Sequence, residues 1–267
     1  MADTRTNPAS SLKIQPTGES FLRPGGREGW WMRRAKIKEP DDHVTCPFDF
    51  VVVPGVEAEQ ARDILREARP ADTPILFGSP HEAGLLLERM SIWPETTRDW
   101  LQKAENFDID AWLAERADQV NEWEKKYSEV IPRRGPWPMK DMAWTNIRVP
   151  KDILTDEFHP TVVIGLLPTD DPTEVAAHLR FGGWNDCPLP PVHIALAKRW
   201  REKYGAVLVS HTYETLEFRV ARPLQDREEA FRVALELFHY NREGVPDTID
   251  SAACELIGSS VWSFWWD

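Results

Sequence analysis

"TLEFRVA", residues 215–221, is the stretch that decides how the second half of the chain folds. In it Leu216, Phe218 and Val220 alternate with Glu217 and Arg219. Successive side chains of a β-strand point to opposite faces of the sheet, so this alternation predicts a strand with one buried face and one face in water.

The segments on both sides of this strand complete a mixed α+β pattern. Strands are predicted at 161–167 and 206–210 and in the terminal "VWSFWWD", and helices at 171–181, at 192–204 and from Asp226 onward. This order matches the split β-α-β (ferredoxin-like) plan, a four-stranded antiparallel sheet with helices on one face. We expect this plan for residues 155–267, with the 161–167 strand in the centre of the sheet and the terminal strand at or beside an edge.

The first half of the chain has a different order of elements. "FDFVVV" predicts a strand at 48–53 and "TPILFG" predicts one at 74–77. Each is followed by a helical pattern, the second of which opens at Ser79-Pro80. A strand-helix-strand-helix order indicates an N-terminal β-α-β-α unit with parallel strands. Residues 91–127 predict further amphipathic helix, with Asp108 or Asp110 as its N-cap.

Composition and turn residues divide the chain into four parts. "IPRRGPWPMKD" at 131–141 is rich in proline and predicts a linker, while the N-terminal residues are rich in Pro, Gly, Ser and Arg. We therefore expect a basic, partly flexible N-terminal arm at 1–40, an α/β subdomain at 41–130, a linker at 131–154 and an α+β domain at 155–267.

The charge of the chain restricts its partners. The 267 residues carry a formal net charge of −12, although residues 1–38 hold eight Lys or Arg against three acids. Nucleic-acid binding needs a basic surface, so this acidity argues against it and favours a basic protein partner. The 13 tryptophans support the same expectation, because indole rings are preferred anchors of protein interfaces.

The cysteines indicate the compartment. Cys46, Cys187 and Cys254 are few, odd in number and far apart, which does not suit a disulfide framework. Neither a CxxC pair nor an HExxH motif is present, so no metal or other cofactor is predicted. The N-terminus lacks the apolar core of a secretory signal, and no apolar run could span a bilayer. We expect a cytoplasmic protein that binds neither membranes nor nucleic acids.

"FGGWNDCPLPPVH", residues 181–193, is the strongest candidate for a functional loop. Cys187 precedes a helix start, where the helix dipole favours a thiolate, and His193 follows six residues later. Such a pair is typical of enzymes in which a histidine activates a cysteine nucleophile, and Glu214 or Glu217 could orient the histidine. The competing interpretation is a rigid corner with a buried cysteine, in which Asn185 and Asp186 hold a turn.

The tryptophan-rich ending carries the second candidate surface. "VWSFWWD" alternates Trp262 and Trp266 on one strand face with Trp265 on the other. Either both faces are covered, or one is a platform for a protein partner. With the loop residues, the candidate binding set consists of Trp184, Asn185, Asp186, Trp262, Trp265 and Trp266.

The blocks "GGWNDCP", "YGAVLVSHTYETLEFRVARPLQDREEA" and "SVWSFWWD" resemble the bacterial family called domain of unknown function 4253. The resemblance covers 161–267 well and the "FVVVPG" and "FDIDAWLAER" segments more loosely. It implies no activity, cofactor or catalytic residue. By analogy with uncharacterised bacterial proteins of this size, we expect a non-catalytic, immunity-type inhibitor that presents an acidic, tryptophan-bearing surface to a basic toxin. The alternative is a cysteine-dependent hydrolase or transferase that uses Cys187 with His193.

Overall fold

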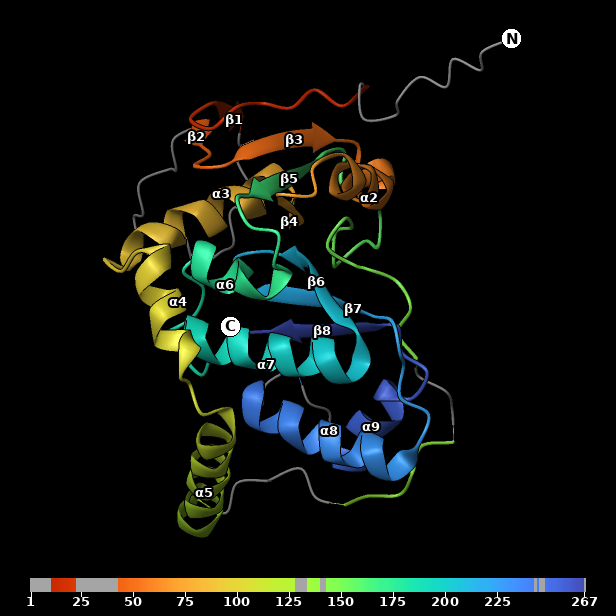
Figure 1. Cartoon of the computed structure of the whole chain (residues 1–267). Helices are drawn as coiled ribbons and strands as arrows, with labels where there is room; N and C mark the ends of the chain where they lie inside the picture. Colours follow the sequence, from red (N-terminus) through yellow and green to blue (C-terminus); the bar gives the residue numbers. More distant parts are fainter. Residues whose placement is uncertain are drawn as a thin grey trace, which may run out of the picture. The chain divides into compact units, whose positions relative to one another are not determined.

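The computed structural model describes residues 11–22, 43–127, 134–139, 143–242, 244 and 248–266 (Figure 1). Helices and strands are mixed, and the strands pair both parallel and antiparallel, so the predicted mixed α+β class is confirmed. Most of the predicted N-terminal arm, residues 1–10 and 23–40, lies outside the described residues.

The contacts between residues group the chain into two units, each built from separated segments. Unit 1 comprises residues 1–92, 148–172 and 210–213, and unit 2 comprises 93–147, 173–209 and 214–267. Such interleaved groups do not test where an independently folding domain begins or ends. The predicted boundaries at 130 and 155 stay predictions.

Unit 1 follows the predicted strand-helix-strand-helix order in its first part. Its elements are β1 (Ser20–Leu22), β2 (His43–Thr45), β3 (Asp49–Val53), η2 (Gly55–Glu57), α2 (Ala58–Ala68), β4 (Thr73–Gly78), α3 (Pro80–Arg89), η3 (Met90–Ile92) and β5 (Val162–Leu167). Ser79 and Glu82 form a capping box at the start of α3, as the Ser-Pro signal predicted.

Strand β5 lies between β3 and β4 and runs antiparallel to both. The two N-terminal strands are therefore parallel to each other, as predicted, but they are not neighbours. Gly165 of β5 pairs with Ile75 of β4, and a Cβ at this glycine would lie 2.2 Å from the Phe77 ring. The absence of a side chain at 165 lets the aromatic ring pack against the centre of β5.

This pairing corrects the expected ferredoxin-like sheet. The 161–167 strand does have a neighbour on each side, but these neighbours are β3 and β4 from the first part of the chain. The 206–210, 215–221 and terminal strands follow one another in the order β6-β7-β8, with β8 last, as expected for an edge strand. The physical reason is that buried strands such as β5 pair with any strand of suitable register, whatever its distance along the sequence.

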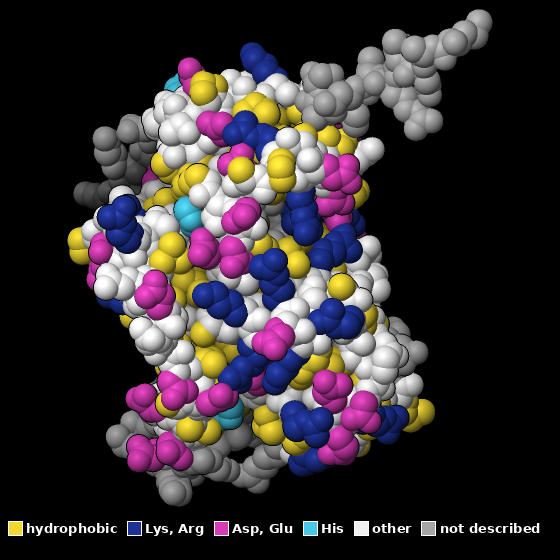
Figure 2. Space-filling view, viewed as in Figure 1, with side chains coloured by type: hydrophobic (Ala, Val, Ile, Leu, Met, Phe, Trp, Pro, Cys, Tyr) yellow, Lys and Arg dark blue, Asp and Glu magenta, His cyan; other side chains and the backbone are white. Residues whose placement is uncertain are grey.

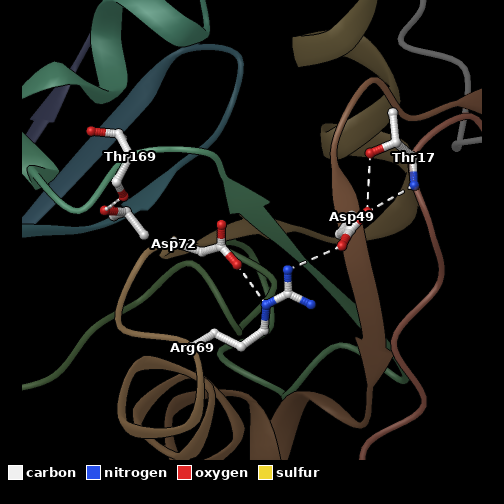
Figure 3. Close-up of polar contacts among 6 residues, drawn as sticks. Thr17, Asp49, Arg69, Asp72 and Thr169 are labelled. Carbon is white, nitrogen blue, oxygen red and sulfur yellow. Dashed lines mark hydrogen bonds and ion pairs between the residues drawn. The ribbon is translucent and has the colours of Figure 1, made fainter.

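Residues 11–22 pair with strands of unit 1 and are not part of a flexible N-terminal arm. Gln15 bridges Phe50 of β3, and β1 pairs with β2. Figure 3 shows the polar contacts that hold this segment: Asp49 accepts hydrogen bonds from the backbone and hydroxyl of Thr17, at 2.9 and 3.0 Å, and pairs with Arg69 at 3.2 Å. Arg69 in turn binds Asp72, at the turn that leads into β4.

Unit 2 contains the remaining helices and the C-terminal strands. Its elements are α4 (Thr97–Glu105), α5 (Ile109–Tyr127), α6 (Val175–His178, after the 3-10 turn η4, Pro172–Glu174), α7 (Pro190–Tyr204), β6 (Ala206–His211, whose last two residues group with unit 1), β7 (Thr215–Val220), α8 (Arg227–Tyr240), α9 (Ile249–Leu256) and β8 (Val261–Trp265). The range 91–127, expected to be helical with an N-cap at Asp108 or Asp110, holds two helices, and the second begins directly after Asp108.

Local signals in unit 2 set the helix ends as expected. Asp108 accepts a hydrogen bond from Ala111 N, and Asp226 caps α8 by accepting one from Glu229 N, at 2.9 Å. Gly205 ends α7 in the left-handed conformation.

The core of unit 2 is aromatic and lies on one face of β7 and β8. Trp200 of α7 stacks on Phe264 with ring centroids 5.3 Å apart, and Tyr240 of α8 meets the same ring edge-on at 5.1 Å. In Figure 1, α7 runs along these strands. On the opposite face, Glu217 was expected to be in water, but it is fully buried. Alternation along one strand cannot show what covers its polar face.

Candidate functional site

The 181–193 loop is a tight turn closed by its own backbone. Cys187 N donates to Trp184 O at 2.8 Å, and Gly183 N donates to Cys187 O at 3.0 Å. Gly182, Gly183 and Asn185 all have positive φ, at 111°, 85° and 44°. The Gly-Gly and Asn residues are thus required by the backbone path, since these conformations are strained for most side chains.

Cys187 and His193 do come together, as their spacing suggested. Cys187 Sγ lies 3.9 Å from His193 Nε2, but the thiol is only 4% exposed and the imidazole is buried as well. The two residues therefore meet inside the protein, beneath the loop. A substrate could reach the sulfur only if the loop opened.

The hydrogen bonds of His193 decide which nitrogen carries the proton. Nε2 lies 2.9 Å from Pro188 O, and a carbonyl can only accept, so Nε2 is the N–H. Nδ1 lies 2.6 Å from the Tyr240 hydroxyl and accepts a hydrogen bond from it. Burial raises the pKa of Tyr240 well above its usual value, which keeps this hydroxyl a donor.

This tautomer is unsuited to activating the cysteine. The nitrogen nearest the thiol, Nε2, already holds a proton and has no lone pair for another. A general base for Cys187 would need the other tautomer, in which Nε2 could no longer donate to Pro188 O. The arrangement instead ties the loop, through His193, to Tyr240 of α8.

The neighbouring loop residues are also involved in packing and ion pairs. Trp184 is half-buried and meets Phe181 edge-on, with centroids 4.8 Å apart. Asn185 is exposed. Asp186 Oδ2 lies 2.7 Å from Arg116 Nη2 of α5 and 3.5 Å from Arg242 Nη2. Sequence reasoning missed both arginines, because nothing local marks a partner 56 or 70 residues away. These contacts do not test whether the loop binds a partner, so its binding role stays a prediction.

The C-terminal tryptophans divide between core and surface. Trp262 and Trp266 are buried on the aromatic face, where Trp262 meets Trp200 at 5.7 Å. Trp265, on the opposite face, is 41% exposed. Of the three C-terminal rings in the candidate binding set, Trp265 is the one that a partner could touch in the folded protein.

Both ends of β8 are hydrogen-bonded on the side away from β7. Trp144 O accepts from Ser260 N and Val261 N, at 2.9 and 3.1 Å, and the Asn241 side chain donates to Trp265 O at 2.6 Å. Such contacts protect an edge strand from pairing with other chains. Trp144 itself is 44% exposed, so one indole is displayed near each end of β8.

His211, in unit 1, is the last residue of β6. It is fully buried, its Nδ1 donates to Thr212 O at 2.8 Å, and burial lowers its pKa from 6.5 to about 3. It is therefore a neutral structural histidine near pH 7.

Asp156 and His159 of "TDEFHP", residues 155–160, have separate partners. Asp156 pairs with Lys151 at 3.1 Å, while His159 Nε2 lies 3.5 Å from Glu82 Oε2. Across the described ranges, no three His, Cys, Asp or Glu side chains are grouped so as to hold a metal ion.

The 181–193 loop, strands β5 to β8 and the C-terminal tryptophans all lie between residues 162 and 266. Residues 163–267 match the family model described as Domain of unknown function (DUF4253). The resemblance of this part of the chain is thereby confirmed, whereas the looser likeness of the earlier segments stays a prediction. The family description names no activity. No curated protein and no solved structure matches the sequence.

A transmembrane helix was not expected from the sequence. Within the part of the chain that the structure describes, no helix is long and apolar enough to cross a bilayer.

Proposed function

We propose that this chain is a non-catalytic protein-binding protein that presents tryptophan side chains of unit 2 to a basic partner. The observation that carries the proposal is the exposure of Trp265 at the end of edge strand β8, while Trp262 in the strand and Trp266 just after it are buried. Trp265 does not contribute to the core, although its strand packs against the core. An exposed indole of this kind is a preferred anchor of protein interfaces. Trp144, at the other end of the strand, supports the same role.

The finer form of the proposal is an immunity-type inhibitor that neutralises a basic toxin in the bacterial cytoplasm. The net charge of −12 supports a basic partner and disfavours nucleic acids and anionic membranes. Figure 2 shows Lys and Arg side chains across the middle of the face that it draws, among acidic ones. On the face drawn in Figure 2, charges of both signs are interspersed, so the acidity of the chain does not form a single patch there.

The cysteine-dependent alternative has less support. It needs Cys187 to meet a substrate and His193 to offer a lone pair at Nε2, but the thiol is buried and Nε2 donates to Pro188 O. A hydrolase or transferase would have to open the 181–193 loop and switch the tautomer before each reaction.

The proposal is tested by isolating the chain at its native expression level and purifying the protein that co-elutes with it. Binding of that purified protein is then measured by calorimetry for the wild type, for Trp144→Ala with Trp265→Ala, and for Met139→Ala. Met139 is fully exposed in unit 2 and serves as the control. The indole variants should weaken binding at least about tenfold and the control should not. A monomeric chain without a partner, or equal binding by all variants, would refute the proposal.

A further inference from the structure

Residues 150–159 of unit 1 form a small hairpin, which we call the apolar hairpin. Its base is the antiparallel bridge between Lys151 and Phe158, and His159 N donates to Pro150 O at 2.9 Å. Its tip is closed by two further backbone hydrogen bonds of 2.9 Å, from Asp152 N to Glu157 O and from Asp156 N to Asp152 O. The backbone of this excursion is therefore well defined.

The Asp152 side chain fixes the tip from inside. Its Oδ1 accepts from Thr155 N and Leu154 N, each at 2.9 Å, and from the Thr155 hydroxyl at 3.2 Å. These amides hold the pKa of Asp152 below its usual value. An Asx turn of this kind limits the conformations of the tip before any partner binds.

The tip displays two large aliphatic side chains to water. Ile153 is 80% exposed and Leu154 is 90% exposed, and Phe158 at the base is about half exposed. A turn of this length could be made from polar residues alone, so its aliphatic side chains gain nothing for the fold of unit 1. Adjacent exposed aliphatic groups on an ordered backbone mark a contact surface.

The base of the hairpin is anchored to unit 1. Gly55 N donates to His159 O at 3.1 Å, and a Cβ at Gly55 would lie 2.4 Å from that oxygen, so the two backbones are in close contact. The aliphatic tip is thus held away from a fixed base, as a docking element requires.

The charges around the tip select the occupant. Asp152, Asp156 and Glu157 surround the aliphatic pair, and Lys151 neutralises one of them by pairing with Asp156 at 3.1 Å. Two such acidic tips would repel each other, which disfavours a second copy of this chain, and an anionic lipid surface would be repelled as well. A groove that is apolar at its base and rimmed by Lys and Arg complements both features.

We propose that the apolar hairpin is a docking element that inserts Ile153 and Leu154 into an apolar, basic-rimmed groove of a second protein. This inference rests on the proposed protein-binding function, but it assigns a surface in unit 1, whereas the exposed indoles belong to unit 2. Directional charge pairs at the rim would set orientation, and the aliphatic side chains would supply most of the affinity.

The experiment places a benzophenone amino acid at position 153 of the full chain in its native host, and at Ile92 as the control. Ile92 is a 68%-exposed isoleucine of unit 1 outside the hairpin. The protein cross-linked at 153 but not at 92 is purified, and its affinity is measured for the wild type, for Ile153→Ser with Leu154→Ser, and for Ile92→Ser.

The double variant should bind about 100-fold more weakly, as expected when two aliphatic side chains no longer enter a groove, and Ile92→Ser should bind within about threefold of the wild type. Raising the salt concentration should weaken wild-type binding. Asp152→Ala, which frees the tip, should lower the affinity without changing Ile153 or Leu154. Because Ile153, Leu154 and Ile92 are exposed, their serine variants should unfold at the wild-type urea midpoint.

Equal cross-linking at 153 and 92, cross-links to a second copy or to lipid alone, or double-variant binding within threefold of the wild type would each overturn the docking proposal. If the indole variants lose binding while the hairpin variants keep it, the hairpin proposal fails and the proposed function stands. If no partner is found by either route, both fail.

Discussion

Gly182→Ala is expected to lower the free energy of unfolding by more than the strain of a positive φ at an alanine would explain. Gly182 has φ 111°, and an alanine Cβ would lie 1.6 Å from Pro188 O and 3.1 Å from His193 Nε2. Strain at such a φ costs about 1–3 kcal/mol. The Pro188 carbonyl must also move, so its bond to His193 is lost and a buried donor is left, at about 1–3 kcal/mol more. The free energy of unfolding should therefore fall by about 2–6 kcal/mol, the sum of the two costs.

Gly18→Ala provides the matched control for this change. Gly18 also has positive φ, 90°, but no heavy atom lies within 4 Å of its added Cβ. It should show only the conformational cost, about 1–3 kcal/mol. Urea unfolding followed by tryptophan fluorescence and far-UV circular dichroism measures both variants. If Gly182→Ala is no more destabilising than Gly18→Ala, the loop is not held by the Pro188 and His193 contact, and the reasoning is refuted.

Two further predictions concern neighbouring rings and the pH dependence of stability. Trp266→Ala should lower the free energy of unfolding by about 3–5 kcal/mol, whereas Trp265→Ala should lower it by about 1 kcal/mol or less, because one ring is buried and the other exposed; equal losses in urea unfolding would contradict the assignment of core and surface. His211 has a pKa of about 3 when folded and 6.5 as its ordinary value, so its contribution to stability is full above pH 6.5 and is lost as pH falls, by up to about 1.4 kcal/mol per pH unit. Urea midpoints between pH 7 and 4 should show a shallower slope for His211→Asn than for the wild type, and an unchanged slope would exclude His211 as the cause.

The secondary structure of this chain was largely readable because its signals are local. The alternation at 215–221 predicted β7, the Ser-Pro pair predicted the start of α3, and Gly205 predicted the end of α7. Each depends on residues within a few positions of one another, where side-chain periodicity and capping operate. The start of α5 was predicted by the Asp108 cap signal, whereas the end of α4 at Asn106 was not, because no proline or glycine marks it.

Strand neighbours could not be read in the same way. Nothing within "TVVIGLLPT" reveals that β5 enters between β3 and β4, which end more than 80 residues earlier. The alternation of side chains along a strand shows which face of the sheet each residue is on, but not which strand pairs with it. The ferredoxin-like plan therefore gave the 161–167 strand the wrong neighbours. The burial of Glu217 has the same origin, since its cover comes from elsewhere in the chain.

The position of the 181–193 loop could be predicted from the sequence, but the hydrogen bonds that set the role of His193 could not. The six-residue spacing placed Cys187 near His193, and the structure brings them to 3.9 Å. What decides the role of His193 is Tyr240, 47 residues later, together with a backbone carbonyl that no side-chain motif encodes. The apolar hairpin was missed for a related reason, because exposure of Ile153 and Leu154 is visible only in three dimensions.

The central claim is that the 181–193 loop is a closed scaffold and that function is carried by recognition elsewhere. Its most direct test is the rate at which Cys187 of the native protein is alkylated by iodoacetamide at pH 7.5, read by mass spectrometry beside Cys46, a buried thiol whose pKa burial raises to about 11. The account predicts that both thiols are labelled only as fast as the protein opens, and that His193→Gln, which weakens the closed loop, speeds the labelling of Cys187 and does not slow it. Rapid labelling of Cys187 alone, slowed in His193→Gln, would contradict it.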